Sequence, residues 1–247
     1  MPLRRPSCLA SLALALLVPA TLCAQVPEKF ENLQVLPKDI ARDSLTQVMR
    51  GFSFALGVRC TYCHVGTDGP GGRMQFALDE KTEKKQARYM MRMADSINRV
   101  LLAALPERSD PPVRVDCVTC HRGLSTPATL ESTLLATAER AGADSAVLQY
   151  RALRADMTSG RWNFGEWSVN ELARKLAARG KTAEAIALLQ VNQEHYPNSA
   201  SIDQQIAEAH LARGERDQAI ARFRAALAKQ PRNQAVRRRL EELGAAP

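Results

Sequence analysis

The 247-residue sequence contains little histidine and no spare cysteine. It has four histidines: His64, His121, His195 and His210. Two of the six cysteines lie near the N-terminus and the other four lie in two short motifs, so none is left for a disulfide. The glycine-rich residues 66–72 are not followed by Gly-Lys-Ser/Thr, which excludes a phosphate-binding loop. The sequence also has no helix-turn-helix, finger or RNA-binding signature, so we expect no nucleic-acid partner.

The sequence Cys-x-x-Cys-His occurs twice, at residues 60–64 and 117–121. It is the attachment signature of c-type haem. Two thiols at this spacing can each bind one haem vinyl group, and the following histidine then supplies the fifth iron ligand. The two copies predict two covalently bound haem c groups. The predicted thioether residues are Cys60, Cys63, Cys117 and Cys120, and the predicted axial histidines are His64 and His121.

The sixth iron ligand is constrained by the lack of further histidines. His195 and His210 fall in a separate C-terminal helical segment. If that segment stays apart, the sixth ligand is methionine, water, a weaker donor or nothing. Methionine raises the reduction potential relative to a second histidine, which suits electron transfer.

The segment before the first motif has the pattern of an amphipathic helix that ends at Gly57. Its apolar face consists of Leu45, Val48, Met49, Phe52 and Leu56. Met49 is therefore either a core residue, since methionine fills irregular gaps, or the sixth ligand of the first haem.

Zinc is the alternative metal, because two Cys-x-x-Cys pairs can form a Cys₄ site. The pairs lie far apart, however, each is followed directly by histidine, and the protein has the features of an exported one. Residues 1–24 resemble a secretory signal, with Arg4 and Arg5 before a short apolar run. We therefore expect a periplasmic protein. A lipid anchor at Cys23 is a weaker alternative, because Leu22 is bulky for lipoprotein processing.

The second motif repeats the plan of the first: a helical pattern over residues 80–105, then a loop, then the motif. The sequences MRGFSFALGVRCTYCHVG, ARYMMRMADSIN and CVTCHRG together resemble the cytochrome c subunit of photosynthetic reaction centres, over about residues 30–125. The resemblance implies that a helix before each motif supplies the sixth ligand. It assigns Met49 to the first haem and Met90 to the second, with Met93 and Met91 as fallbacks. Arg59 and Arg122 flank the motifs, and each is either a surface arginine or the partner of a haem propionate.

The C-terminal part has a different organisation. Residues 126–165 form a connector with helical stretches at 129–141 and 144–158, followed by Trp162, Phe164 and Trp167, which we expect to be packing anchors. Residues 166–231 repeat with a period of 34, which is typical of tetratricopeptide helix pairs. Asn192 occupies a position that normally holds a small residue. Residues 232–243 predict a capping helix.

The sequence thus predicts an all-α protein. We expect a signal peptide at 1–24, a loop-rich dihaem cytochrome c domain at 25–125, a helical connector at 126–165 and tetratricopeptide repeats at 166–247. The expected function is electron transfer with a redox protein or membrane electron-transfer complex, with a protein partner at the repeats. The alternative is a dihaem, peroxidase-like enzyme with one open iron. The net charge of +8 indicates either a solvated arginine-rich surface or a docking face for an acidic partner.

Overall fold

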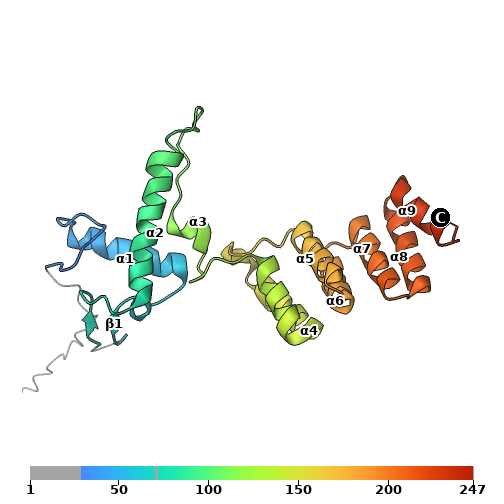
Figure 1. The fold of residues 1–247 in the computed structure, drawn as a ribbon, viewed down its shortest axis with the longest axis horizontal. Coiled ribbons are helices and arrows are strands. Elements are labelled where there is room, and N and C mark those ends of the chain that lie inside the picture. The colour runs from blue at the N-terminus through green and yellow to red at the C-terminus, as the bar shows by residue number, and fades with distance from the viewer. Residues whose placement is uncertain (1–28, 70–71, 247) are drawn as a thin grey trace, which may run out of the picture. The chain divides into compact units, whose positions relative to one another are not determined.

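The computed structural model describes residues 29–69 and 72–246. Contacts divide this part of the chain into two compact units (Figure 1). The N-terminal unit comprises residues 29–53 and Val58–Val115, and the C-terminal unit comprises Phe54–Gly57 and residues 116–246. The expected all-α class is confirmed, since helices dominate and the strands form one short hairpin. The predicted signal peptide and Cys23 lie outside the described residues.

The N-terminal unit is built on two helices and a small hairpin. The elements are α1 (Arg42–Leu56, whose last residues belong to the C-terminal unit), η1 (Cys60–Tyr62), β1 (Val65–Gly66), β2 (Met74–Gln75), α2 (Thr82–Ser96) and η2 (Ile97–Leu101). The two strands pair antiparallel. The helical pattern over residues 80–105 corresponds to α2 and to η2, where the chain continues as a π-helix.

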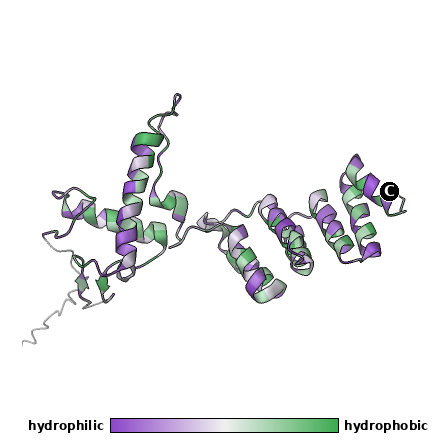
Figure 2. Cartoon of the chain, viewed as in Figure 1, coloured by the Kyte–Doolittle hydropathy of each residue, from purple (hydrophilic) through white to green (hydrophobic). Residues whose placement is uncertain are grey.

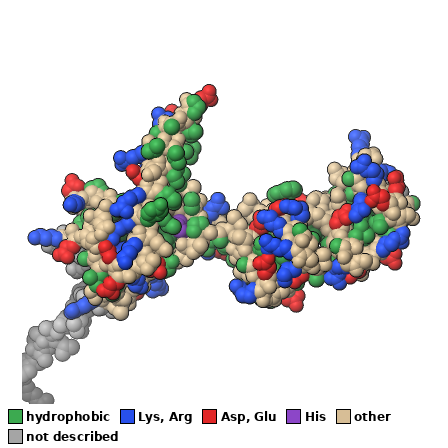
Figure 3. Space-filling view, in the orientation of Figure 1, with side chains coloured by type: hydrophobic (Ala, Val, Ile, Leu, Met, Phe, Trp, Pro, Cys, Tyr) green, Lys and Arg blue, Asp and Glu red, His purple; other side chains and the backbone are tan. Residues whose placement is uncertain are grey.

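The N-terminal unit buries very few apolar side chains. Leu45 is its one buried hydrophobic residue among those described. Several large apolar residues of α2 and the segment after it are exposed instead: Tyr89, Met90, Met93, Val100, Leu101 and Leu105. Figure 3 shows apolar side chains gathered along one edge of this helix. We call these six residues the α2 apolar stripe. The unit is therefore not organised around an apolar core of its own.

The C-terminal unit is a series of packed helices. They are α3 (Cys117–His121), α4 (Leu130–Ala155), η3 (Met157–Ser159), α5 (Glu166–Ala178), α6 (Thr182–Gln193), α7 (Ala200–Ala212), α8 (Arg216–Lys229) and α9 (Gln234–Glu242). One apolar cluster joins α4, α5, α6 and α7, and a second joins α7, α8 and α9. Figure 2 shows apolar and polar residues alternating along these helices, as expected where one face is buried. No helix of the described residues is long and apolar enough to span a bilayer.

The boundaries of these helices follow two features of the sequence. Gly142 has non-helical backbone angles inside α4, so this element is two helices joined at a kink, as the two predicted stretches require. Helices α5, α7 and α9 begin at residues 166, 200 and 234, in steps of 34. The helix starts thus reproduce the sequence period. The tetratricopeptide assignment and the domain boundaries drawn from sequence remain predictions.

Two packing expectations have different outcomes. Asn192 is fully buried, and its amide donates to the Asn170 side chain and to the Glu166 carbonyl, each at 3.1 Å. A polar link between α5 and α6 therefore occupies the small-residue position. Phe164 is buried as an anchor, but Trp167 is 74% exposed, so its prediction as an anchor was wrong.

The end of α1 makes a close backbone contact with the turn that follows the second motif. The Gly123 N–H donates to the Ala55 carbonyl at 2.7 Å. Gly57 has φ +65°, and a Cβ there would overlap the carbonyl of Gly123. Glycine is therefore required at position 57 both for the backbone angle and for space.

Gly57→Ala should destabilise the holoprotein. The left-handed backbone alone costs about 1–2 kcal/mol for alanine, and the overlap with Gly123 adds to this. Gly51→Ala is the control, because a methyl group at this position within α1 would meet no atom within 4 Å, and alanine favours helix there by about 0.5–1 kcal/mol. Denaturant unfolding of both variants measures the difference, and equal stabilities would contradict the contact.

A buried carboxylate holds three of the C-terminal helices together. Asp203 of α7 is 1% exposed and pairs with Arg222 at 3.0 Å and with Lys229 at 2.5 Å, both from α8. Gln193 of α6 donates to the same carboxylate at 2.7 Å. Such a carboxylate is tolerated in the interior because charged and polar partners replace its hydration.

Asp203→Ala should lower the free energy of unfolding by about 2–4 kcal/mol, because it leaves two partly buried cations without their partner. Glu194→Gln provides the matched control. It removes a carboxylate that pairs with Arg151 at an exposed site, where the pair contributes less than about 1 kcal/mol. Chemical denaturation is the measurement, and similar losses in the two variants would contradict a special role for Asp203.

Candidate functional site

The first motif forms a tight turn directly after α1. The Cys63 and His64 N–H groups donate to the Cys60 carbonyl at 3.2 and 3.0 Å. Lys81 donates to the Thr61 carbonyl at 2.6 Å and so fixes the residues between the cysteines. Neither cysteine is in a disulfide. The turn therefore presents two cysteines at the spacing that haem attachment requires.

His64 is held against Phe76, which follows β2. The two rings meet edge to face with centroids 5.1 Å apart. Burial lowers the pKa of His64 below its usual value, and the positive charge of Lys84 lowers it further. Its Nδ1 is buried and has no hydrogen-bond partner among the described residues. Neutral imidazole is the form that binds iron, so this histidine is suited to be an axial ligand.

The segment that carries Phe76 is fixed by charged side chains of α2. Lys84 donates to the carbonyls of Phe76 and Leu78, both at 2.7 Å, and pairs with Asp79 at 2.9 Å. Arg88 also pairs with Asp79, at 2.7 Å. Hydrogen bonds from Arg88 and Lys84 hold the pKa of Asp79 far below its usual range. Asp79 is therefore ionised. Its ion pairs, together with the hydrogen bonds of Lys84, hold the segment that carries Phe76 against α2.

The second motif forms the short helix α3. His121 is 6% exposed, and its Nδ1 lies 2.8 Å from the Leu124 carbonyl. A carbonyl only accepts, so Nδ1 carries the proton and Nε2 is left with a free lone pair. Such a hydrogen bond is the usual means of orienting a metal-bound histidine. Arg161 donates to the carbonyl of Arg122, within the same turn, at 3.2 Å.

The strip leading to the second motif is tied to η2. The Asn98 amide donates to the Val115 carbonyl, and the Val115 N–H donates to the Asn98 side-chain oxygen, both at 2.8 Å. The Asn98 side chain thus bonds both backbone groups of Val115, as a neighbouring strand would. Because Asn98 lies in η2, the π-helical segment helps to hold the strip that leads to the second motif.

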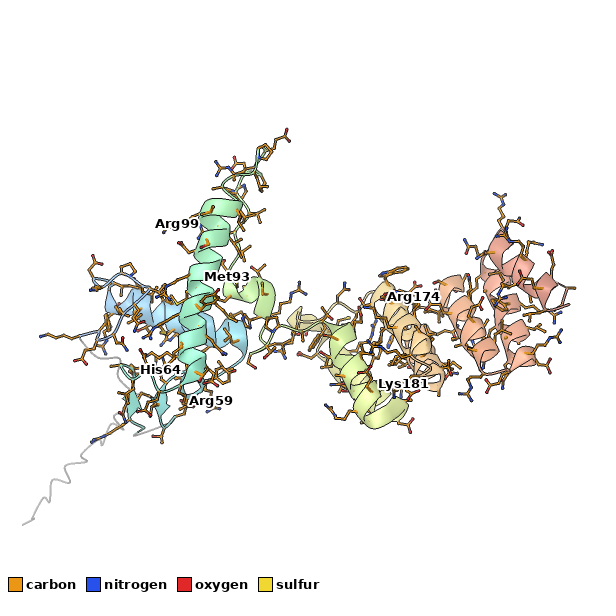
Figure 4. The ribbon with its side chains drawn as sticks, viewed as in Figure 1. Arg59, His64, Met93, Arg99, Arg174 and Lys181 are labelled. Carbon is orange, nitrogen blue, oxygen red and sulfur yellow. The ribbon has the colours of Figure 1, made fainter. Side chains whose placement is uncertain are left out.

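The candidate sixth ligands lie on the two long helices of the N-terminal unit. Met49 is partly buried on α1. Met90 and Met93 are 40% and 47% exposed and belong to the α2 apolar stripe, whereas Met91 is partly buried. Figure 4 shows Met93 about midway along α2 and His64 near the hairpin. Residues three apart share a helix face, so Met90 and Met93 both remain candidates.

An open hollow of about 450 Å³ lies beside the first motif. Arg59, Tyr62 and Lys81 line it, together with Glu83. Arg59, labelled in Figure 4, is thus accessible to an anionic group, and so is Lys81. The basic lining is compatible with the sequence-based hypothesis of an arginine that pairs with a propionate.

These residues fit covalently bound haem. Each motif offers two cysteines outside any disulfide and one buried or partly buried imidazole, and α1 and α2 carry methionines with soft thioether donors. Within the described ranges, no three His, Cys, Asp or Glu side chains converge as a metal site would require. The zinc alternative therefore gains no support. When bound, haem supplies an iron that gains and loses one electron.

Sequence reasoning missed four residues that shape these sites: Phe76, Lys84, Asn98 and Arg161. Lys84 stands in a run of charged residues that has the composition of a solvated helix start. Phe76 lies in no motif. Asn98 and Arg161 act through backbone groups that are remote in sequence. No local pattern marks any of the four, because each depends on a tertiary contact.

Comparison with known proteins supports the same conclusion. Residues 18–163, more than half of the chain, match the family described as photosynthetic reaction centre cytochrome c subunit. The match includes both motifs and extends past residue 125 into the connector.

Three characterised relatives are similar over shorter stretches. Cytochrome c-554 of Chloroflexus aurantiacus is 34% identical over 36% of this chain and 20% of its own length. The photosynthetic reaction center cytochrome c subunits of Roseobacter denitrificans and Rubrivivax gelatinosus are 33% and 36% identical, over 40% and 32% of this chain. The matched segments span only 25% and 23% of those two proteins. The protein is a c-type cytochrome with covalently bound haem c, and it belongs to the photosynthetic reaction centre cytochrome c subunit family.

Proposed function

We propose that the protein is an exported dihaem electron carrier. The observation that carries this proposal is the presence of two complete attachment motifs, each with a histidine suited to bind iron. Cys60 and Cys63 hold one haem, and Cys117 and Cys120 hold the other. No side chain needs to react with a substrate, because electron transfer requires only that the iron be held and shielded.

The chain's own residues set the properties of each haem. His64 and His121 serve as the fifth ligands. Met49 serves as the sixth ligand at the first haem and Met90 at the second, with Met93 as the alternative. A methionine sulfur as the sixth ligand raises the reduction potential of the haem above the value that a second histidine ligand would give. The α2 apolar stripe provides an apolar surface against the haem, and this surface limits the access of water to the iron.

The partner is a redox protein or a membrane electron-transfer complex in the periplasm. Two relatives are named as photosynthetic reaction center subunits, which supports a membrane complex as one form of partner. The C-terminal helices, interpreted as tetratricopeptide repeats, would hold a protein partner on their surface. Anchoring through Cys23 is the less favoured alternative to a free periplasmic protein.

Expression with a cytochrome c maturation system tests the proposal. We expect two haems per chain by pyridine haemochrome assay, and a far-red absorption band of methionine-ligated ferric iron that corresponds to both haems. Met49→Leu and Met90→Leu should each halve that band. Met157→Leu is the control, because Met157 is exposed in the C-terminal unit.

Three outcomes would change the assignment. If Met93→Leu loses half of the far-red band and Met90→Leu keeps all of it, Met93 would be assigned as the sixth ligand of the second haem. A high-spin component in the unmodified protein would indicate an open iron and the peroxidase-like alternative. Protein without haem would contradict both the carrier and the enzyme.

A further inference from the structure

The segment 76–79 carries the ring that contacts His64, and three successive carbonyls of its backbone accept hydrogen bonds from side chains. Lys84 holds the carbonyls of Phe76 and Leu78. Asn32 holds the intervening carbonyl of Ala77 at 2.5 Å. Successive carbonyls are thus bound from two sides, so the Phe76 ring has little freedom to move away from His64.

The ammonium group at the centre of this arrangement is buried. Lys84 is 8% exposed, although lysine is rarely buried unless it is paired. It donates hydrogen bonds to two carbonyls and forms an ion pair with Asp79, and these contacts replace the hydration of the ammonium group. The next residue along the helix, Lys85, is exposed and has no comparable partners among the described residues. Of these two consecutive lysines, one is therefore buried and paired and the other is exposed to solvent.

Asp79 provides the opposite charge. One oxygen of its carboxylate pairs with Lys84 and the other pairs with Arg88. Gln34 also donates to it, at 3.2 Å. The group of Lys84, Arg88 and Asp79 carries one net positive charge beside the Phe76–His64 contact. A charge that is shielded from water acts over a longer distance than an exposed one, because the surrounding dielectric is lower.

We propose that Lys84 is a positioning residue for His64, and that the Lys84–Asp79 pair sets the reduction potential of the haem at the first motif. Lys84 acts through Phe76, whose ring limits the rotation of the imidazole. Its positive charge favours the reduced iron, and Asp79 opposes this effect. The inference rests on the proposed function to the extent that it requires haem bound at Cys60 and Cys63.

The test is a spectroelectrochemical titration of the holoprotein and four variants. Lys84→Met should lower the potential of the first haem, and Asp79→Asn should raise it. We expect each to change the one-electron equilibrium constant by about tenfold, which corresponds to 59 mV. Lys84→Arg keeps the charge and should stay within twofold of the unmodified protein. Lys85→Met removes the same charge at an exposed site and should also stay within twofold.

The second haem provides an internal reference in every sample, and the haem content of each variant is measured first. Shifts of opposite sign in Lys84→Met and Asp79→Asn, confined to the first haem, would support the inference. A pair that only stabilises the fold would lower the unfolding midpoint in both variants and leave the potential unchanged, and this result would overturn it. If the variants nevertheless contain two haems per chain, the proposed electron-carrier function would still be supported. Unmodified protein lacking haem at Cys60 and Cys63 would overturn both.

Discussion

The hydrogen bond between the Gly123 N–H and the Ala55 carbonyl connects the last turn of α1 to the turn that follows the second motif. Ala55 lies at the end of the helix that leads into the first motif, and Gly123 lies in the turn that leaves the second. The approach is close because Gly57 faces the Gly123 carbonyl without a side chain. The same turn carries the Leu124 carbonyl that orients His121 and is held by Arg161. The ligand of the second motif is thus positioned by segments that lie far before and after it.

The two units are stabilised by different interactions. The C-terminal unit has continuous apolar clusters, supplemented by buried polar links at Asn192 and Asp203. The N-terminal unit relies on charged and polar contacts to backbone carbonyls, such as those of Lys84 and Asn98. In the N-terminal unit, charged and polar side chains thus hold the loops in place, and few apolar side chains are buried.

The sequence predicted the parts of the structure that depend on local chemistry. The end of α1 before Gly57 and the division of α4 into two helical stretches each follow from residue type and spacing. The 34-residue period gave the helix starts of the C-terminal unit. The burial of Lys84 was not predictable, because its partners are carbonyls whose position depends on the fold. The exposure of Trp167 was missed for the same reason, since aromatic residues in a connector are compatible with either environment.

The two units differ in how much apolar surface they bury, and this difference affects the order in which they can fold. The C-terminal helices bury two continuous apolar clusters, and this burial favours folding without any contribution from a cofactor. Among the described residues of the N-terminal unit, Leu45 is the one buried apolar side chain, so the folding of this unit gains much less from apolar burial. The C-terminal unit can therefore fold before haem is attached at the first motif.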